Sequence, residues 1–286
     1  MYVVTAATGQ LGRLVVDALL EKVPAEQVAV VVRNEAKAAD LAARGVTVRV
    51  ADYGAPESLA NAFEAGDRVL FVSGSDVGRR IPQHAAVVAA AKAAGVGLLA
   101  YTSVLGGPAA DFTLADDHKA TEELVIASGL PYTLLRNGWY HENYTEQLAP
   151  VLAHGAVVAS AGDGRVASAS RADYAAAAAA VLTGEGHEGQ VYELSGDTAW
   201  SLAEYAAELS RQTGREIRYT PVTPEEHLAI LTGAGLPEPL AAILVDVDTS
   251  GIARGLLAGT SGDLARLIGR PTTPLADAIA VALKDA

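Results

Sequence analysis

The chain opens with a short apolar strand that runs into a glycine-containing turn and then into an amphipathic helix. Residues 2–12 read YVVTAATGQLG, and the helix that follows keeps its leucines and valines on one face. A helix that starts at such a turn directs unpaired backbone N–H groups and the positive end of its dipole toward the space above the strand. The opening therefore predicts a turn that binds phosphate.

A second apolar strand, residues 28–32, ends at Arg33. Chains that bind NAD usually place Asp or Glu here for the ribose 2′-hydroxyl, whereas a cation can pair with a 2′-phosphate. Strand, turn, helix, second strand and terminal charge follow in the order that a dinucleotide site requires. The segment therefore predicts an NADP(H) site. Ala6 stands where the usual motif has its first glycine, and a positive φ there would cost about 1 kcal/mol or more.

The composition excludes several classes of protein. The 286 residues carry a formal net charge of −13, contain no cysteine and are 50% hydrophobic and 19% charged. The charge disfavours nucleic acid as a partner, and the missing cysteines exclude disulfides and thiolate chemistry. Metal-ligand spacing is absent, and no run approaches the roughly 20 apolar residues of a membrane span. We expect a soluble cytoplasmic protein without a leader peptide, a monomer or homodimer that contacts neither nucleic acid nor membrane.

Strand and helix patterns alternate through the first half of the chain. We expect strands at 46–50, 68–72, 98–102 and 132–136, and helices at 35–44, 56–64, 82–94 and 116–128. Near-continuously apolar strands alternating with helices indicate an α/β fold of the Rossmann type, a doubly wound parallel sheet covered on both faces. Its ligand would lie at the carboxyl ends of the strands.

The alternation loosens after residue 136. We expect helix up to residue 153, a strand at 156–160, a helix at 171–182 and a strand at 191–194, followed by helices at 201–213, 223–234, 236–246 and after Pro274. We therefore divide the chain into an NADP-binding domain, 1–136, completed by parts of 155–194, and a smaller, discontinuous substrate-binding lobe, 137–286.

The usual catalytic pair of a short-chain reductase is missing. In that pair, Tyr-x-x-x-Lys on the helix after the fifth strand, the lysine lowers the tyrosine pKa for proton transfer. No tyrosine here has a lysine four residues later. The equivalent helix carries His118 and Glu122 on one face, either as a solvated helix start or with His118 directed at a substrate.

The motifs together resemble the NmrA-like group of atypical short-chain dehydrogenases, and within it the bacterial quinone reductases, with triphenylmethane dye reductases as near relatives. The resemblance spans nearly the whole chain. It rests on TGQLG (8–12), VRN (32–34), YTS (101–103), LLRNGWY (134–140), ENY (142–144), AGDG (161–164), SRADY (170–174), GHEG (186–189) and LIG (267–269).

The resemblance implies that NADP contacts residues from five parts of the chain. These are Ala6, Ala7, Thr8, Gly9, Gln10 and Leu11; Arg33; Ser73, Gly74 and Ser75; Asn137, Gly138, Trp139, Tyr140, His141 and Glu142; and Arg171. The first three groups also fall at predicted strand ends. Trp139 and Tyr140 can stack on a planar ring or pack between lobes, and Arg171 can bind cofactor or pair with Asp173.

We therefore expect an NADPH-dependent reductase that transfers hydride to a quinone or a similar planar conjugated acceptor. Quinones accept hydride readily and water can protonate the product, so no Tyr-Lys pair is needed. His118 and Tyr140 are the candidate proton or hydrogen-bond donors. Two alternatives stay open: reduction of a triphenylmethane dye, azo or carbonyl compound, and a non-catalytic NADP(H)-binding redox sensor.

Overall fold

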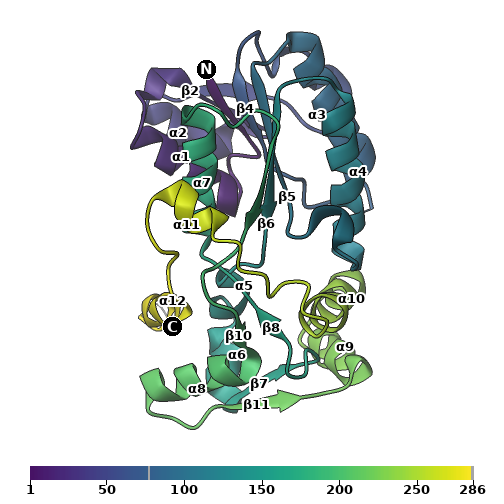
Figure 1. Cartoon of the computed structure of the whole chain (residues 1–286), viewed down its shortest axis with the longest axis vertical. Coiled ribbons are helices and arrows are strands. Elements are labelled where there is room, and N and C mark those ends of the chain that lie inside the picture. Colours follow the sequence, from purple (N-terminus) through teal and green to yellow (C-terminus); the bar gives the residue numbers. More distant parts are fainter. Residues whose placement is uncertain (77, 285–286) are drawn as a thin grey trace.

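The computed structural model describes residues 1–76 and 78–284, and its centre is a seven-stranded parallel sheet (Figure 1). The strand order is β3-β2-β1-β4-β5-β6-β9. The strands are β1 (Tyr2–Thr5), β2 (Val28–Val32), β3 (Thr47–Val50), β4 (Arg68–Phe71), β5 (Leu98–Val104), β6 (Tyr132–Asn137) and β9 (Gln190–Leu194). The strand order reverses between β1 and β4, so the predicted Rossmann-type, doubly wound α/β fold is confirmed.

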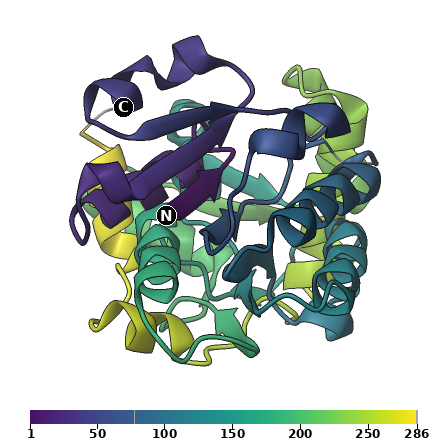
Figure 2. The same cartoon turned by 90° about the horizontal axis from the view of Figure 1, so that it is seen from above.

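Helices cover both faces of this sheet (Figure 2). The helices α1 (Gln10–Leu20) and α7 (Arg171–Thr183) pack against each other on one face, and α3 (Arg80–Ala94) and α4 (Thr113–Ala127) pack on the other. The alanine run 175–180 of α7 is almost fully buried, because small side chains let the helix approach α1 and the sheet closely. The run is thus a packed core helix.

The connections differ from prediction in four places. Residues 35–44 form a 3₁₀ turn, η2 (Glu35–Ala38), and a short helix, α2 (Ala39–Ala43), and residues 56–64 contain only the 3₁₀ turn η3 (Pro56–Asn61). A further 3₁₀ turn, η1 (Ala25–Gln27), precedes β2. Helix α3 begins at Arg80 and not at Pro82, because a proline is tolerated in the first turn, where its missing N–H has no partner to lose.

The chain after β6 builds a smaller lobe beside the carboxyl ends of β5 and β6 (Figure 1). This lobe and its connections contain η4 (Gly107–Ala109), α5 (Glu142–Thr145), α6 (Leu148–His154), β7 (Ala156–Ala159), β8 (Arg165–Val166), β10 (Trp200–Ser201), α8 (Leu202–Thr213), β11 (Arg218–Pro221), α9 (Pro224–Gly233), α10 (Glu238–Asp246), the π-helix η5 (Val247–Ile252) and α12 (Leu275–Ala282). Strand β11 pairs with β7 and β10 with β8. A separate apolar cluster around Trp200 and Tyr205 forms the core of the lobe.

The chain leaves this lobe twice to return to the central sheet. Helix α7 and strand β9 do so first, and α11 (Asp263–Ile268) then packs against both of them. The domain division at residue 136 stays a prediction. Strands β8, β10 and β11, helix η5 and helix α11 were not expected, because segments of two to six residues are too short for a periodic pattern. None of the helices described combines the length and apolarity needed to cross a membrane.

Candidate cofactor site

The turn after β1 is held in a strained conformation. Ala6 has φ of +49°, and among the described residues it is the one non-glycine position with positive φ. Its carbonyl oxygen accepts a hydrogen bond of 3.0 Å from the Gly9 N–H, which closes the turn. Gly12 lies against the same peptide, because a Cβ there would come within 2.5 Å of the Ala6 oxygen. The turn therefore requires glycine at position 12 and tolerates alanine at position 6 at a cost.

We expect Ala6→Gly to tighten NADPH binding or leave it unchanged. Glycine adopts positive φ without the clash that a Cβ causes, and this relieves roughly 1–2 kcal/mol of strain that the greater freedom of glycine in the unfolded chain partly offsets. Fluorescence titration with NADPH measures the effect, with Ala7→Gly as the control in an unstrained position. Clearly weaker binding by Ala6→Gly would contradict this interpretation of the turn.

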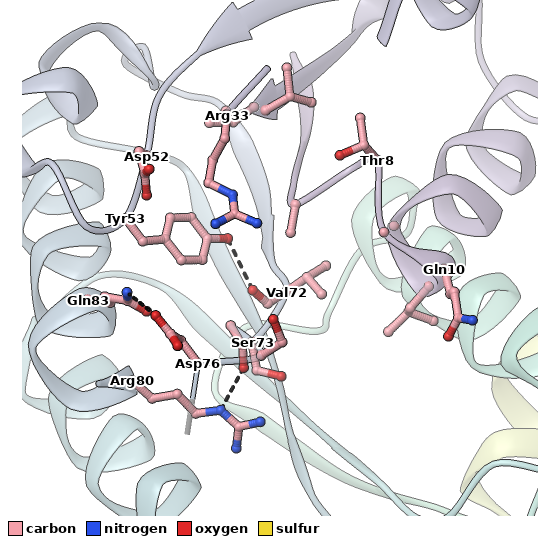
Figure 3. Close-up of a pocket in the computed structure, with 18 of the residues that line it drawn as sticks. Thr8, Gln10, Arg33, Asp52, Tyr53, Val72, Ser73, Asp76, Arg80 and Gln83 are labelled. Atoms are coloured by element: carbon pink, nitrogen blue, oxygen red, sulfur yellow. Dashed lines mark hydrogen bonds between the residues drawn. The ribbon is translucent and has the colours of Figure 1, made fainter. Parts of the chain in front are cut away.

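A cavity of about 610 Å³ extends from this turn along the carboxyl ends of β1, β2 and β4, where the strand order reverses (Figure 3). Among its lining residues are most of those predicted to bind cofactor: Ala6, Thr8, Gly9, Gln10, Leu11, Arg33, Ser73, Gly74, Ser75, Trp139, Tyr140 and Arg171. The sequence motifs thus converge on one site, although their separate roles there stay predictions. The cavity has the position that the fold gives to a dinucleotide.

The end of the cavity beside β2 carries two cations. Arg33 follows β2 directly and Lys37 comes from η2, and neither side chain forms an ion pair with any described residue. Tyr53 lies beside Arg33 with its ring along the cavity, and its hydroxyl is within hydrogen-bonding distance of Thr5 and of the Val72 carbonyl, 3.1 Å away (Figure 3). The two cations fit the 2′-phosphate of NADP(H), and the flat ring of Tyr53 fits the adenine of the same cofactor.

The loop after β4 is held by helix α3. The Gly74 N–H donates to His84 Nε2 at 3.0 Å, and the Gly74 carbonyl accepts from Arg80 Nε at 2.6 Å. Because His84 Nε2 accepts this bond, His84 Nδ1 carries the proton and donates to Thr121 Oγ1 at 2.8 Å. Burial lowers the pKa of His84 to about 4, so the imidazole is neutral and the loop is fixed.

Aromatic side chains line the opposite end of the cavity, where the two lobes meet. Trp139 and Tyr140 follow β6, and the guanidinium of Arg171 lies 5.2 Å from the centre of the Tyr140 ring. Burial raises the pKa of Tyr140, so its hydroxyl keeps its proton and can serve as a hydrogen-bond donor. This end of the cavity suits a planar ring with a polar edge.

Five residues predicted to contact the cofactor do not line this cavity, and three of them use their polar groups within the fold. Ala7 is fully buried in the core, and Asn137 lies within β6. Gly138 N–H donates to the Leu194 carbonyl at 2.7 Å. The ring of His141 contacts Ser168 and the Thr273 carbonyl, and the Glu142 carboxylate accepts from the Arg171 N–H at 2.9 Å at the start of α7.

His118, a candidate proton donor, also lies outside the cavity lining. It is 6% exposed, and its Nδ1 is 2.8 Å from the hydroxyl of Tyr101, which is fully buried. Burial lowers the pKa of His118 to about 3, which leaves it neutral at physiological pH. The side chain is directed at Tyr101 of β5, and its role as a proton donor stays a prediction.

Several lining residues were not among the predicted site residues, and four of them carry polar or charged groups that matter here: Lys37, Tyr53, Arg80 and Gln83. Arg80 and Gln83 are one turn apart on α3, but the expected helix began at Pro82, which left Arg80 in a loop. Lys37 lies four residues after Arg33, and this spacing of two cations was an available signal. Tyr53 follows a strand end, where ligand contacts are common in such sheets.

The chain belongs to the NAD(P)H-binding family, which matches residues 6–185. It is 50% identical over 279 residues to quinone oxidoreductase 2 of Escherichia coli, covering 98% of this chain and 97% of that one. A crystal structure of the NADPH-dependent quinone oxidoreductase of E. coli complexed with NADPH superposes with a TM-score of 0.96 at 49% identity, covering 99% and 100% of the two chains. The Citrobacter triphenylmethane reductase complexed with NADP(H) gives 0.95 at 43% identity, over 99% and 100%.

Proposed function

We propose that this protein is an NADPH-dependent reductase that transfers hydride to a quinone or a similar planar conjugated acceptor. The observation that carries the proposal is one continuous cavity with unpaired cations at the β2 end and the rings of Trp139 and Tyr140 at the other. The relatives with NADPH-bound structures support the same activity. Hydride transfer to a planar acceptor needs that acceptor in contact with the nicotinamide, and the aromatic end of the cavity offers a surface that can hold it there.

The residues of the chain bind, orient and shield the reactants. The turn at Gly9 and the amides at the start of α1 would hold the diphosphate, and Arg33 with Lys37 would hold the 2′-phosphate. When bound, NADPH supplies the hydride. Trp139 and Tyr140 would hold the acceptor in contact with the reactive ring and exclude water, and the Tyr140 hydroxyl would donate to an acceptor oxygen. This arrangement explains how the protein can act without a Tyr-Lys pair.

Steady-state oxidation of NADPH with a panel of acceptors tests the proposal. We expect turnover with benzoquinones and naphthoquinones and preference for NADPH over NADH. Triphenylmethane dyes and azo compounds belong in the panel, because the relatives include the triphenylmethane reductase and an NAD(P)H azoreductase of Xenophilus azovorans, 32% identical over 97% of this chain. Tight NADPH binding without oxidation by any acceptor would overturn the proposal and favour a redox sensor.

A further inference from the structure

Arg80 is a buried cation in the wall of the cavity. It is 8% exposed and lines the cavity from the first turn of α3, across from Arg33 (Figure 3). Its Nε donates to the Gly74 carbonyl at 2.6 Å, which fixes the plane of the guanidinium. Nη1 is fully buried, and neither Nη1 nor Nη2 has a hydrogen-bond acceptor among the described residues.

The charge of Arg80 is not neutralised by the fold. Within the described residues no carboxylate lies in ion-pair distance of it, although Asp117 on α4 is near enough to oppose the lowering of its pKa by burial. Asp76 accepts from Gln83, and Glu122 is occupied by Ser103 and Arg136. The other neighbours are Tyr101 and two neutral histidines, His84 and His118, whose pKa values the Arg80 charge further lowers after burial.

A buried, unpaired guanidinium is costly for a folded protein, and such groups usually bind a partner. No described residue supplies that partner, and the cavity is the side from which one can come. Arg80 also packs beside α4, the helix on which a short-chain reductase carries its substrate-facing donor. His118 of that helix is neutral and does not line the cavity, whereas Arg80 is charged and does.

We propose that Arg80 binds the acceptor oxygen that becomes negatively charged when hydride is transferred. This inference rests on the proposed function. Hydride adds one hydrogen and one negative charge to the quinone, the nicotinamide is oxidised to NADP⁺, and a proton from water completes the hydroquinone. The guanidinium, whose Nη2 has no partner among the described residues, stabilises the intermediate anion more than the neutral quinone, which is the condition for catalysis.

The phosphates of the cofactor are the competing partner for Arg80. The 2′-phosphate has Arg33 and Lys37 at the opposite side of the cavity, and the diphosphate has the turn at Gly9 and the N-terminus of α1. These groups match the cofactor charges without Arg80. Of the cations that line the cavity, Arg33 and Lys37 lie at the β2 end and Arg171 pairs with Glu146, so Arg80 is the one left for the acceptor oxygen among the described residues.

The test compares Arg80→Gln with Arg79→Gln, an exposed arginine at the start of the same helix. At saturating NADPH we expect Arg80→Gln to lower kcat/KM for quinones by about 10²-fold, with the Kd for NADPH changed less than about threefold, and Arg79→Gln to match the wild type. A second readout without turnover is the Kd of the anion 2-hydroxy-1,4-naphthoquinone for the NADP⁺ complex, measured by fluorescence quenching. We expect Arg80→Gln to raise it about 10-fold or more.

Several results would overturn the inference. One is unchanged binding of the naphthoquinone anion by Arg80→Gln, and another is a large rise in the Kd for NADPH with unchanged acceptor kinetics, which would assign Arg80 to the cofactor. If Arg80→Gln does not fold, Arg80→Lys replaces it. Lysine keeps the charge and loses the planar guanidinium, so we expect weaker binding of the anion, and binding equal to the wild type would overturn the inference. Arg80-dependent binding of the anion by a protein that reduces no acceptor would refute the proposed function alone.

Discussion

Arg33→Ala is expected to raise the KM for NADPH by about 10- to 100-fold and to leave the KM for NADH within about twofold. Hydrogen bonds between a guanidinium and a phosphate contribute about 1.5–3 kcal/mol, which corresponds to that range. Arg33 follows β2, extends into the cavity and has no carboxylate partner among the described residues, so its charge is available to the 2′-phosphate. NADH lacks this phosphate, and its binding should not depend on Arg33.

Arg44→Ala is the matched control for this measurement. Arg44 is also exposed and lies at the end of α2, but it pairs with Asp17 at 2.6 Å and does not line the cavity. The control therefore separates a local contact from the general loss of one positive charge. Equal increases in KM for NADPH and NADH in Arg33→Ala would refute the assignment of the 2′-phosphate.

The sequence predicted the fold well because the fold depends on local patterns. Each parallel strand is a short apolar run between polar turns, and its position follows from periodicity and composition. The turn at Gly9–Gly12 and the charge at Arg33 are also local, since each is a short segment that directly follows one strand.

The parts of the site that the sequence did not predict depend on packing between distant segments. Asn137, His141 and Glu142 share a motif with Trp139 and Tyr140, but only Trp139 and Tyr140 of these five line the cavity. Glu142 binds the start of α7 while Tyr140 lines the cavity. The spacing of residues along the sequence does not predict which side chains face the cavity, because that depends on how the smaller lobe folds back over the sheet.

His118 and Glu122 show the same limit on one helix. Their spacing of four residues places them on one face of α4, yet they bind different partners. His118 contacts Tyr101, and Glu122 accepts from Ser103 at 2.5 Å and from Arg136 at 2.7 and 2.9 Å. The buried polar groups of β5 and β6 determine these pairings, and helical periodicity does not reveal them.

We expect Glu122→Gln to lower the free energy of unfolding by about 3–5 kcal/mol, because it removes one partner of a buried ion pair. The Glu122 side chain is 4% exposed, and that of Arg136 is 15% exposed. Glu122 raises the pKa of Arg136 through two hydrogen bonds, so the guanidinium stays charged and would lose its main counterion. The amide of a glutamine would also turn a donor toward the guanidinium in place of one acceptor.

The remaining partners cannot compensate for this loss. Glu193 is more exposed and already accepts from Arg136 and from the Gly106 N–H, each at 2.8 Å. The guanidinium cannot shift toward Gly107, because it already lies against this glycine. A Cβ at position 107 would come within 2.1 Å of Arg136 Cζ. The contacts among Ser103, Glu122, Arg136 and Glu193 therefore hold β5, β6 and β9 together at the ends that face the smaller lobe.

Urea unfolding of the two variants Glu122→Gln and Glu123→Gln measures the effect with a neighbouring control. Glu123 is exposed on the same helix, and its substitution should change the unfolding free energy by less than about 0.5 kcal/mol. The loss of 3–5 kcal/mol would be a large part of the total stability of a typical domain, about 5–15 kcal/mol. If both variants unfold alike, the pair carries no net stabilisation, and β5 and β6 are held by their backbone ladder and apolar packing alone.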